Sequence, residues 1–221
     1  MPVGTILNIK PGAKILFAKD AGMKVLGTIR ALGTQNNRIK FTSDRPQSRS
    51  WDEIRIDYAV NSIFSNCDFE YATWGIHSHF TALQVIGCSF QKNYGGIRFR
   101  SGPLLIKNSR FNENIIGIRS YLGKALITSN IITKNEKGIF VREGGGGLTV
   151  SRNNFFANSD YNIRIGEFNT EDVSAAENWW GKDDPAETFF DAHREPGIGY
   201  VLYQPVLKEA LDITITDDSQ Q

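Results

Sequence analysis

The chain of 221 residues is poor in the residues on which metal sites and disulfide frameworks depend. It has two cysteines, two methionines and three histidines. No CxxC pair occurs, and the cysteines lie away from the histidines, so the spacing does not fit a zinc site or a redox motif. The net charge is only +1, which argues against a polybasic coat for nucleic acid or an anionic membrane. We therefore expect no metal, no cofactor and no nucleic-acid partner.

Long apolar runs are also missing. None approaches the roughly 20 residues that a helix needs to span a bilayer, so we expect no membrane insertion. The first residues do not combine a basic segment with an apolar one, so we expect no signal peptide within this sequence. The hydrophobic content of 40% is nevertheless enough for a core. Frequent Gly, Asn and Ser residues indicate many short strands joined by turns.

A repeat of 21 residues is the strongest feature of the sequence. A fixed period of this length indicates stacked supersecondary units. Within each repeat, apolar residues alternate as they do in strands, and the apolar positions of one coil match those of the next. Coils of about 21–25 residues leave no room for crossover helices, so we predict an all-β solenoid with parallel pairing. Two series show the step: Phe69, Phe90, Phe111 and Ile132, and the Gly-Ile pairs at Gly75, Gly96, Gly117 and Gly138.

Polar residues recur at the turns with the same step. Asparagines lie between the two strands of successive coils, and stacked asparagines can bond to the next coil and to the local backbone. We therefore predict an asparagine ladder at Asn93, Asn114, Asn135 and Asn158. The glycine before each isoleucine suggests a turn that needs a positive φ, with Asn162 as its substitute in the fifth repeat.

The cysteines follow the repeat as well. Cys67 and Cys88 are 21 residues apart and should stack on adjacent coils about 4.8 Å apart. A disulfide is geometrically feasible, but parallel Cβ vectors at that spacing exceed the preferred Cβ–Cβ distance of about 3.8 Å. We expect two reduced, buried thiols, with a disulfide as the alternative.

The domain organisation follows from where the repeat is regular. We predict a β-helix of about seven to nine coils over residues 1–180, irregular over 1–59 and regular over 60–180. Residues 181–208 should form a C-terminal cap, and 209–221 a tail. Trp180 falls in the inward column of Phe155 and should cap the core, whereas Trp74 is expected to be exposed with Tyr71.

The coils with their Phe, Asn and Gly-Ile positions resemble the right-handed parallel β-helix repeats of the pectate-lyase-like superfamily. Two further stretches resemble the opening and closing segments of such domains in bacterial extracellular proteins: LNIKPGAKILF with GTIRALGT, and AENWWGKDDP followed by GYVLYQPVL. The resemblance implies a single-stranded right-handed parallel β-helix, a secreted or cell-surface location and contact with polysaccharide. It leaves the activity open, because this fold hosts lyases, hydrolases, epimerases, adhesins and scaffolds.

Cationic and aromatic residues gather on the outward side of the strand that carries each Gly-Ile pair. Six of the thirteen arginines and two of the three histidines fall in two adjacent columns. Arginine suits bidentate binding of carboxylate or sulfate, and Tyr121 and Phe140 could stack on sugar rings. The predicted binding surface for an acidic polysaccharide comprises Arg55, His77, His79, Arg98, Arg100, Arg119, Tyr121, Phe140, Arg142 and Arg164.

Two other interpretations of this surface stay open. The arginines could form a solvated face whose charge blunts aggregation. Alternatively, the face could be catalytic, in a polysaccharide lyase or epimerase: His77 or His79 would be the base, Arg98, Arg100 and Arg119 would neutralise a uronate, and Tyr121 would be the acid. A calcium-dependent lyase needs several carboxylates on this face, and a glycosidase needs two. Asp57 is the one carboxylate in the two columns, which argues against both mechanisms.

We therefore expect a non-catalytic structural or carbohydrate-facing module of a secreted or cell-surface bacterial protein. A lyase or epimerase acting on uronate-containing glycans is the first alternative. The second is a spacer or assembly subunit whose coils stack end to end or against the rest of a parent protein, because an open strand edge invites pairing.

Overall fold

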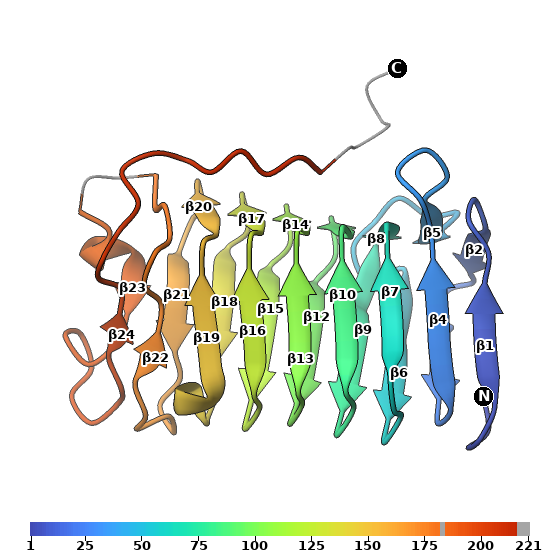
Figure 1. The fold of residues 1–221 in the computed structure, drawn as a ribbon, viewed down its shortest axis with the longest axis horizontal. Helices are drawn as coiled ribbons and strands as arrows, with labels where there is room; N and C mark the ends of the chain where they lie inside the picture. The colour runs from blue at the N-terminus through green and yellow to red at the C-terminus, as the bar shows by residue number, and fades with distance from the viewer. Residues whose placement is uncertain (182–183, 216–221) are drawn as a thin grey trace.

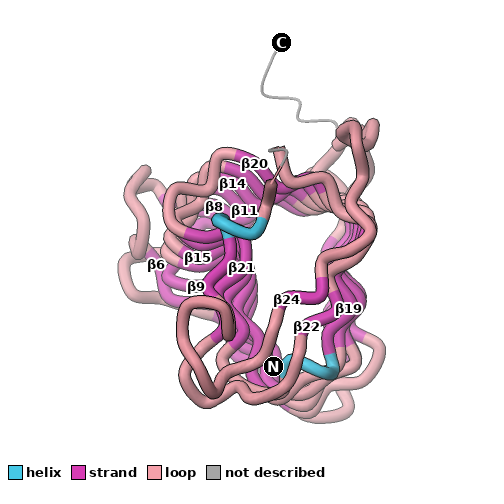
Figure 2. The backbone as a smooth tube through the Cα atoms, turned by 90° about the vertical axis from the view of Figure 1, so that its left-hand side faces the viewer, coloured by secondary structure: helices cyan, strands magenta, loops and turns pink. Residues whose placement is uncertain are grey.

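A computed structural model describes residues 1–181 and 184–215 of the chain. Within these residues the backbone winds into a parallel β-solenoid of about eight turns, with strands stacked along its length (Figure 1). Seen from its end, the solenoid is a ring whose walls are strands and whose corners are loops (Figure 2). The predicted all-β solenoid is confirmed.

Three parallel sheets form the walls in the described part of the chain. Sheet A contains β1 (Ile6–Ile9), β4 (Thr28–Leu32), β7 (Ser62–Ser65), β10 (Leu83–Ile86), β13 (Leu104–Lys107), β16 (Ala125–Thr128), β19 (Leu148–Ser151), β22 (Val173–Ser174) and β24 (Val201–Leu202). Sheet B contains β2 (Lys14–Phe17), β5 (Ile39–Ser43), β8 (Cys67–Glu70), β11 (Ser89–Gln91), β14 (Arg110–Asn112), β17 (Ile131–Thr133) and β20 (Asn154–Phe156).

Sheet C contains β3 (Met23–Val25), β6 (Trp51–Asp57), β9 (Ala72–His79), β12 (Gly95–Arg100), β15 (Ile116–Tyr121), β18 (Lys137–Val141), β21 (Tyr161–Ile165) and β23 (Phe189–Phe190). Two short 3-10 helices, η1 (Gly145–Gly147) and η2 (Ala186–Thr188), interrupt the loops. Among the residues that the structure describes, no helix is long and apolar enough to cross a membrane.

The 21-residue period sets the register between coils. Phe69, Phe90 and Phe111 are direct partners in sheet B. Their rings stack with centroids 4.5 Å and 4.9 Å apart, and all three are fully buried. Because each inward residue lies on its counterpart in the next coil, the core is a set of continuous ladders of like side chains.

Single residues with positive φ make the corners. One column of corners lies between sheets A and B, a second between B and C, and a third after the sheet C strands. The third column includes Tyr58, Phe80, Ser101, Leu122 and Gly144, with φ from 48° to 72°. A left-handed residue turns the chain sharply within one position, which explains how a coil of 21 residues carries three strands.

The prediction of positive φ at the glycine before each isoleucine was wrong. Gly75, Gly96 and Gly117 lie inside strands, and their φ is not positive. A Cβ on Gly96 would lie 2.5 Å from the carbonyl oxygen of Gly117 in the next coil. Close approach of adjacent backbones therefore selects glycine here. Asn162 occupies the equivalent position in the fifth repeat, and its φ is not positive either. Its Nδ2 donates to Thr188 Oγ1 at 3.0 Å.

The predicted asparagine ladder is present and fully bonded. Asn114 Oδ1 accepts from the backbone N–H and the Nδ2 of Asn93, both at 3.0 Å. Asn114 Nδ2 in turn donates to Asn135 Oδ1 and to the carbonyl of Phe90, again at 3.0 Å. A second ladder, which the sequence reasoning missed, runs through Asn130, Asn153 and Asn178 at the corner between sheets A and B.

The aromatic and sulfur residues singled out from the sequence are buried. Trp180 stacks on Phe155 with ring centroids 4.6 Å apart, as expected for a residue that covers the core. Trp74, expected to be exposed, is only 3% exposed because Tyr94 and Arg98 pack on its ring. Cys67 and Cys88 are buried free thiols.

The last described residues run back along the solenoid (Figure 1). Leu207 donates its backbone N–H to the carbonyl of Asn178 at 3.0 Å. The side chain of Asn154 exchanges two hydrogen bonds with the backbone of Leu211, at 2.8 Å and 2.9 Å. This part of the predicted tail is thus attached to the coils, and residues 216–221 lie outside the described residues.

Candidate functional site

The outward face of sheet C places the two predicted columns side by side. In one column His77, Arg98 and Arg119 are direct strand partners. In the other, Asp57, His79, Arg100 and Tyr121 follow one another in register. Because the strands are parallel and in register, side chains that are 21 residues apart in sequence lie about 4.8 Å apart across the sheet.

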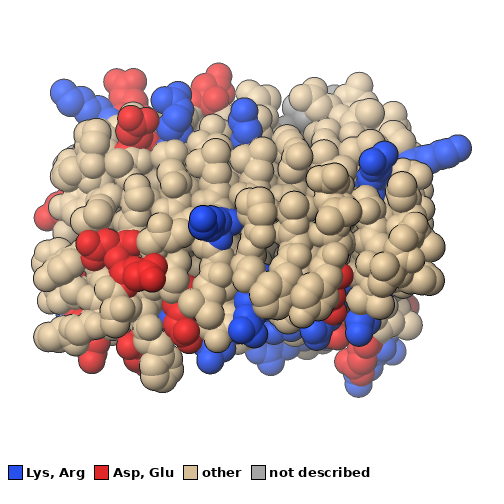
Figure 3. Space-filling model, turned by 60° about the horizontal axis from the view of Figure 1, so that its bottom comes forward, with Lys and Arg blue, Asp and Glu red and all other residues tan. Residues whose placement is uncertain are grey.

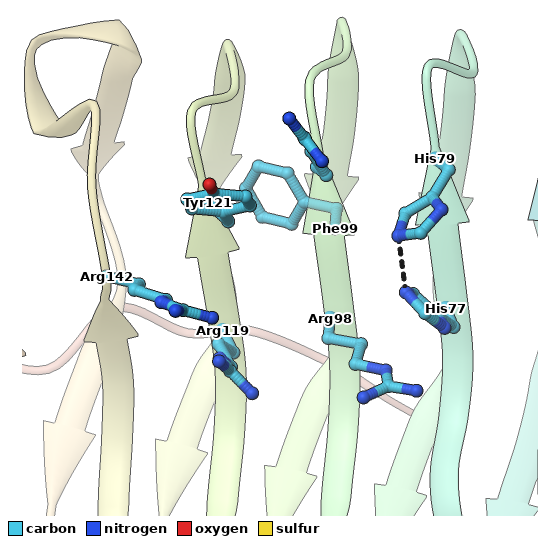
Figure 4. A pocket seen from close by; sticks show the side chains of 8 residues that line it. His77, His79, Arg98, Phe99, Arg119, Tyr121 and Arg142 are labelled. Carbon is cyan, nitrogen blue, oxygen red and sulfur yellow. Dashed lines mark hydrogen bonds between the residues drawn. The ribbon is translucent and has the colours of Figure 1, made fainter.

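Several of these residues surround a hollow of about 220 Å³ on the face of sheet C. The histidines border it from β9, and the arginines and tyrosine border it from β12, β15 and the end of β18 (Figure 4). The residues that line the hollow are His77, His79, Arg98, Phe99, Arg100, Arg119, Tyr121 and Arg142.

Glu53 is the principal residue of the site that the sequence reasoning missed. A β-bulge between Glu53 and Ile54 shifts the pairing of β6 with β9. Glu53 is 6% exposed, and its carboxylate accepts from His77 Nδ1 at 2.7 Å and from Arg98 Nη2 at 2.6 Å. The alternation of Glu53, Arg55 and Asp57 carries the signal, because all three lie on one side of a strand.

A chain of hydrogen bonds connects the two histidines. His77 Nε2 and His79 Nε2 are 2.7 Å apart, and Arg55 Nη2 lies 3.3 Å from His79 Nδ1. The partners assign the protons: His77 donates from Nδ1 to Glu53, so its Nε2 accepts from His79, whose Nδ1 accepts from Arg55. Asp57 Oδ1, 3.3 Å from His79 Nδ1, becomes the acceptor when His79 is protonated.

Burial and the neighbouring charges shift the pKa values of His79 and Glu53 in this series of hydrogen bonds. Burial lowers the pKa of His79 below its ordinary value of 6.5, and the neighbouring His77 and Arg55 lower it further. Burial tends to raise the pKa of Glu53, but the hydrogen bonds and charges of His77 and Arg98 outweigh this effect and lower it. Glu53 is therefore a carboxylate and His79 a neutral base at neutral pH.

Three arginines on the other side of the hollow lack such partners. Within residues 1–181 and 184–215, no carboxylate lies within 4.0 Å of Arg100, Arg119 or Arg142. Burial lowers the pKa of Arg119, and the charges of Arg142 and Arg98 lower it further. The three arginines therefore leave an uncompensated positive field over the hollow.

The remaining predicted residues lie outside the hollow. Arg55 bonds Asp57 at 2.9 Å and is already neutralised. Phe140 lies beneath Arg119, with the guanidinium carbon 5.8 Å from its ring centroid. Arg164 lies over the ring of Phe190 at 4.8 Å.

The arrangement combines a cluster of arginines with two imidazoles at its edge. In the part of the chain that the structure describes, no group of three or more His, Cys, Asp or Glu side chains is placed to hold a metal ion. The imidazoles of His77 and His79 bond to each other and to protein partners rather than converging on an open point. The geometry therefore supports anion binding and proton transfer.

Comparison with known proteins gives the family. A family model described as a right-handed beta helix region matches residues 28–179. No curated protein and no solved structure matches the chain.

Proposed function

The chain belongs to the right-handed β-helix family, and because that fold alone fixes no activity, we propose from its site that it binds an acidic polysaccharide. The hollow on sheet C is the contact surface, and the chain is a carbohydrate-facing module of a secreted or cell-surface bacterial protein. The proposal is carried by Arg100, Arg119 and Arg142, which line the hollow and have no carboxylate partner among the described residues.

Like charges on adjacent strands repel each other unless a counter-anion is present. Arginine pairs with planar carboxylate or sulfate through two parallel hydrogen bonds. Figure 3 shows Lys and Arg along the lower margin of the molecule with Asp and Glu among them, while much of the surface in front of them carries neither sign. A local positive patch on a nearly neutral protein favours a bound acidic chain over general attraction to anions.

The experiment measures retention on alginate, polygalacturonate and heparin-like chains at low and high salt. We expect salt-sensitive binding that Arg119→Ala weakens by about tenfold, the loss of one charge-assisted pair. Arg164→Ala is the matched control, because Arg164 lies on the same sheet face but outside the hollow. Equal losses in both variants, or retention that salt does not change, would contradict the proposal.

Proton transfer is the second candidate function. It is favoured by the series of hydrogen bonds that runs from Arg55 through His79 and His77 to Glu53. A neutral imidazole beside a cluster of arginines can remove a proton from a carbon next to a neutralised carboxylate. Lyase activity on uronate chains would then produce unsaturated products that absorb ultraviolet light. Absorbance that grows with the wild type and is abolished in His79→Ala would establish it, and binding without absorbance would exclude it for these polymers.

A further inference from the structure

Two aromatic side chains stand exposed beside the hollow, where the chain leaves sheet C. Tyr58 follows β6 and is 72% exposed, and Phe80 follows β9 and is 43% exposed. Their rings stack with centroids 5.1 Å apart and an interplanar angle of 5°. The backbone keeps them in register, because each donates its N–H to the carbonyl that precedes the next corner: Tyr58 to His79, and Phe80 to Arg100.

The fold does not require aromatic residues at these positions. Tyr58 and Phe80 have φ of 54° and 49°, where a bulky residue is strained by about 1–2 kcal/mol. The same corner on a later coil is occupied by Gly144, which avoids this strain. Both rings also leave apolar surface in water, so neither is explained by packing or by backbone preference.

The two rings continue into the arginines of the hollow. The guanidinium carbon of Arg100 lies 5.5 Å from the ring centroid of Phe80 and 4.9 Å from that of Tyr121. Arg142 lies on Tyr121 at 5.1 Å. Tyr121 and Arg142 are seen side by side in Figure 4. The result is one line of planar groups, from Tyr58 to Arg142, that crosses successive coils along the edge of the hollow.

We propose that the stacked pair of Tyr58 and Phe80 forms a platform whose outer face, on Tyr58, holds a sugar ring of the same acidic polysaccharide. This inference rests on the proposed function and names its ligand more closely: a chain with acidic groups in the hollow and a pyranose with an unsubstituted apolar face beyond it. Phe80 is two coils from Tyr121, about 10 Å at the spacing of parallel strands. A chain held in the hollow therefore extends over the platform only when it is longer than a disaccharide.

A single-stranded nucleic acid also uses aromatic stacking and positive charge. The charge distribution favours the glycan. Single-stranded nucleic acids are held by a basic groove that follows the backbone, whereas here Arg100, Arg119 and Arg142 gather around one hollow and the chain carries a net charge of +1. Next to the platform, Arg55 is bonded to Asp57 and is not free for a phosphate.

The test is isothermal titration calorimetry with a disaccharide, a tetrasaccharide and a hexasaccharide of galacturonate. We expect affinity to rise by about tenfold once the oligomer reaches the platform. Phe80→Gly should abolish this rise and leave disaccharide binding unchanged. Because glycine is favoured at a positive φ, the same variant should not lower the Tm, which separates a ligand-binding role from a structural one. Leu122→Ala is the control, an exposed residue of the same corner column outside the stack.

The outcomes separate the two proposals. If the oligomers bind equally and Phe80→Gly changes nothing while Arg119→Ala removes binding, the platform is refuted and the proposed function stands. If no acidic oligosaccharide binds, both are refuted. If an oligothymidylate binds in a Phe80-dependent manner and the glycans do not, the platform belongs to single-stranded nucleic acid and the inference is overturned.

Discussion

Replacing Glu53 with glutamine should lower stability and strengthen ligand binding at once. Glu53 is buried and accepts one hydrogen bond from His77 and one from Arg98. The amide has one oxygen, and its NH2 group must face a donor, so one of the two partners loses its acceptor. An unpaired buried donor costs about 1–3 kcal/mol, and more for a charged group. Arg98 has a side chain 31% exposed, so water recovers part of this loss. We expect the free energy of unfolding to fall by about 2 kcal/mol.

The effect on binding has the opposite sign. The charge of Glu53 offsets that of Arg98, which lines the hollow. Removing one negative charge near a site that is open to water changes the interaction with an anion by about 1 kcal/mol. Acidic polysaccharide should therefore bind about fivefold more tightly at low ionic strength. The gain should decrease as salt is added, because the Debye length shortens.

Urea denaturation and retention on polygalacturonate measure the two effects. Asp52→Asn is the matched control, because Asp52 is an exposed carboxylate on the same strand. If Glu53→Gln and Asp52→Asn differ by less than about 0.5 kcal/mol in stability, the buried pair contributes nothing and the reasoning fails. Weaker binding by Glu53→Gln would show that Glu53 acts by positioning Arg98 rather than by its charge.

Two further predictions follow from the ladder and the histidines. Asn114→Ala should lower the free energy of unfolding by about 2–4 kcal/mol, because it removes the side chain that bridges two neighbouring coils. In urea denaturation Asn112→Ala, whose side chain bonds only to its exposed neighbour, should lose less than about 1 kcal/mol, and equal losses would exclude the ladder as a source of stability. Because the pKa of His79 is lowered from 6.5, the unfolded chain binds this proton more tightly, so stability should fall as pH drops below 6.5 towards the folded pKa. Over the same range retention on acidic polysaccharide should rise, since protonation adds positive charge to the hollow, and a His79→Gln variant with the same pH profile would contradict this.

The fold could be predicted from the sequence because the core repeats itself. Each coil places the same kind of residue against its counterpart, as Phe69, Phe90 and Phe111 show, so one period fixes both the strands and their register. The asparagine ladder follows from the same period, since each amide needs the next one as its partner.

The site was only partly predictable, because its decisive features break the period. Glu53 bonds to His77 and Arg98 next to a bulge that no 21-residue step reveals. Gly96 recurs with the repeat as a turn residue would, but it lies inside a strand. Glycine is needed there because the carbonyl oxygen of Gly117 in the next coil leaves no room for a Cβ. The difference between Arg119, which has no carboxylate partner, and Arg98, which is paired with Glu53, depends on side-chain conformation rather than on sequence position.

The positive charge on the face of sheet C changes along the solenoid axis, and this change affects the direction in which a polymer would bind. Glu53 and Asp57 on β6 offset the charges of Arg98 and Arg55, respectively. On the following coils Arg119 and Arg142 have no such partners, so the positive field is strongest towards β15 and β18. Beyond them the guanidinium of Arg164 lies over the ring of Phe190. A chain bound as we propose has its acidic groups over β15 and β18 and an apolar ring face on Tyr58. Reversing the chain would bring acidic groups towards the carboxylates of β6, so the two directions along the axis differ in free energy.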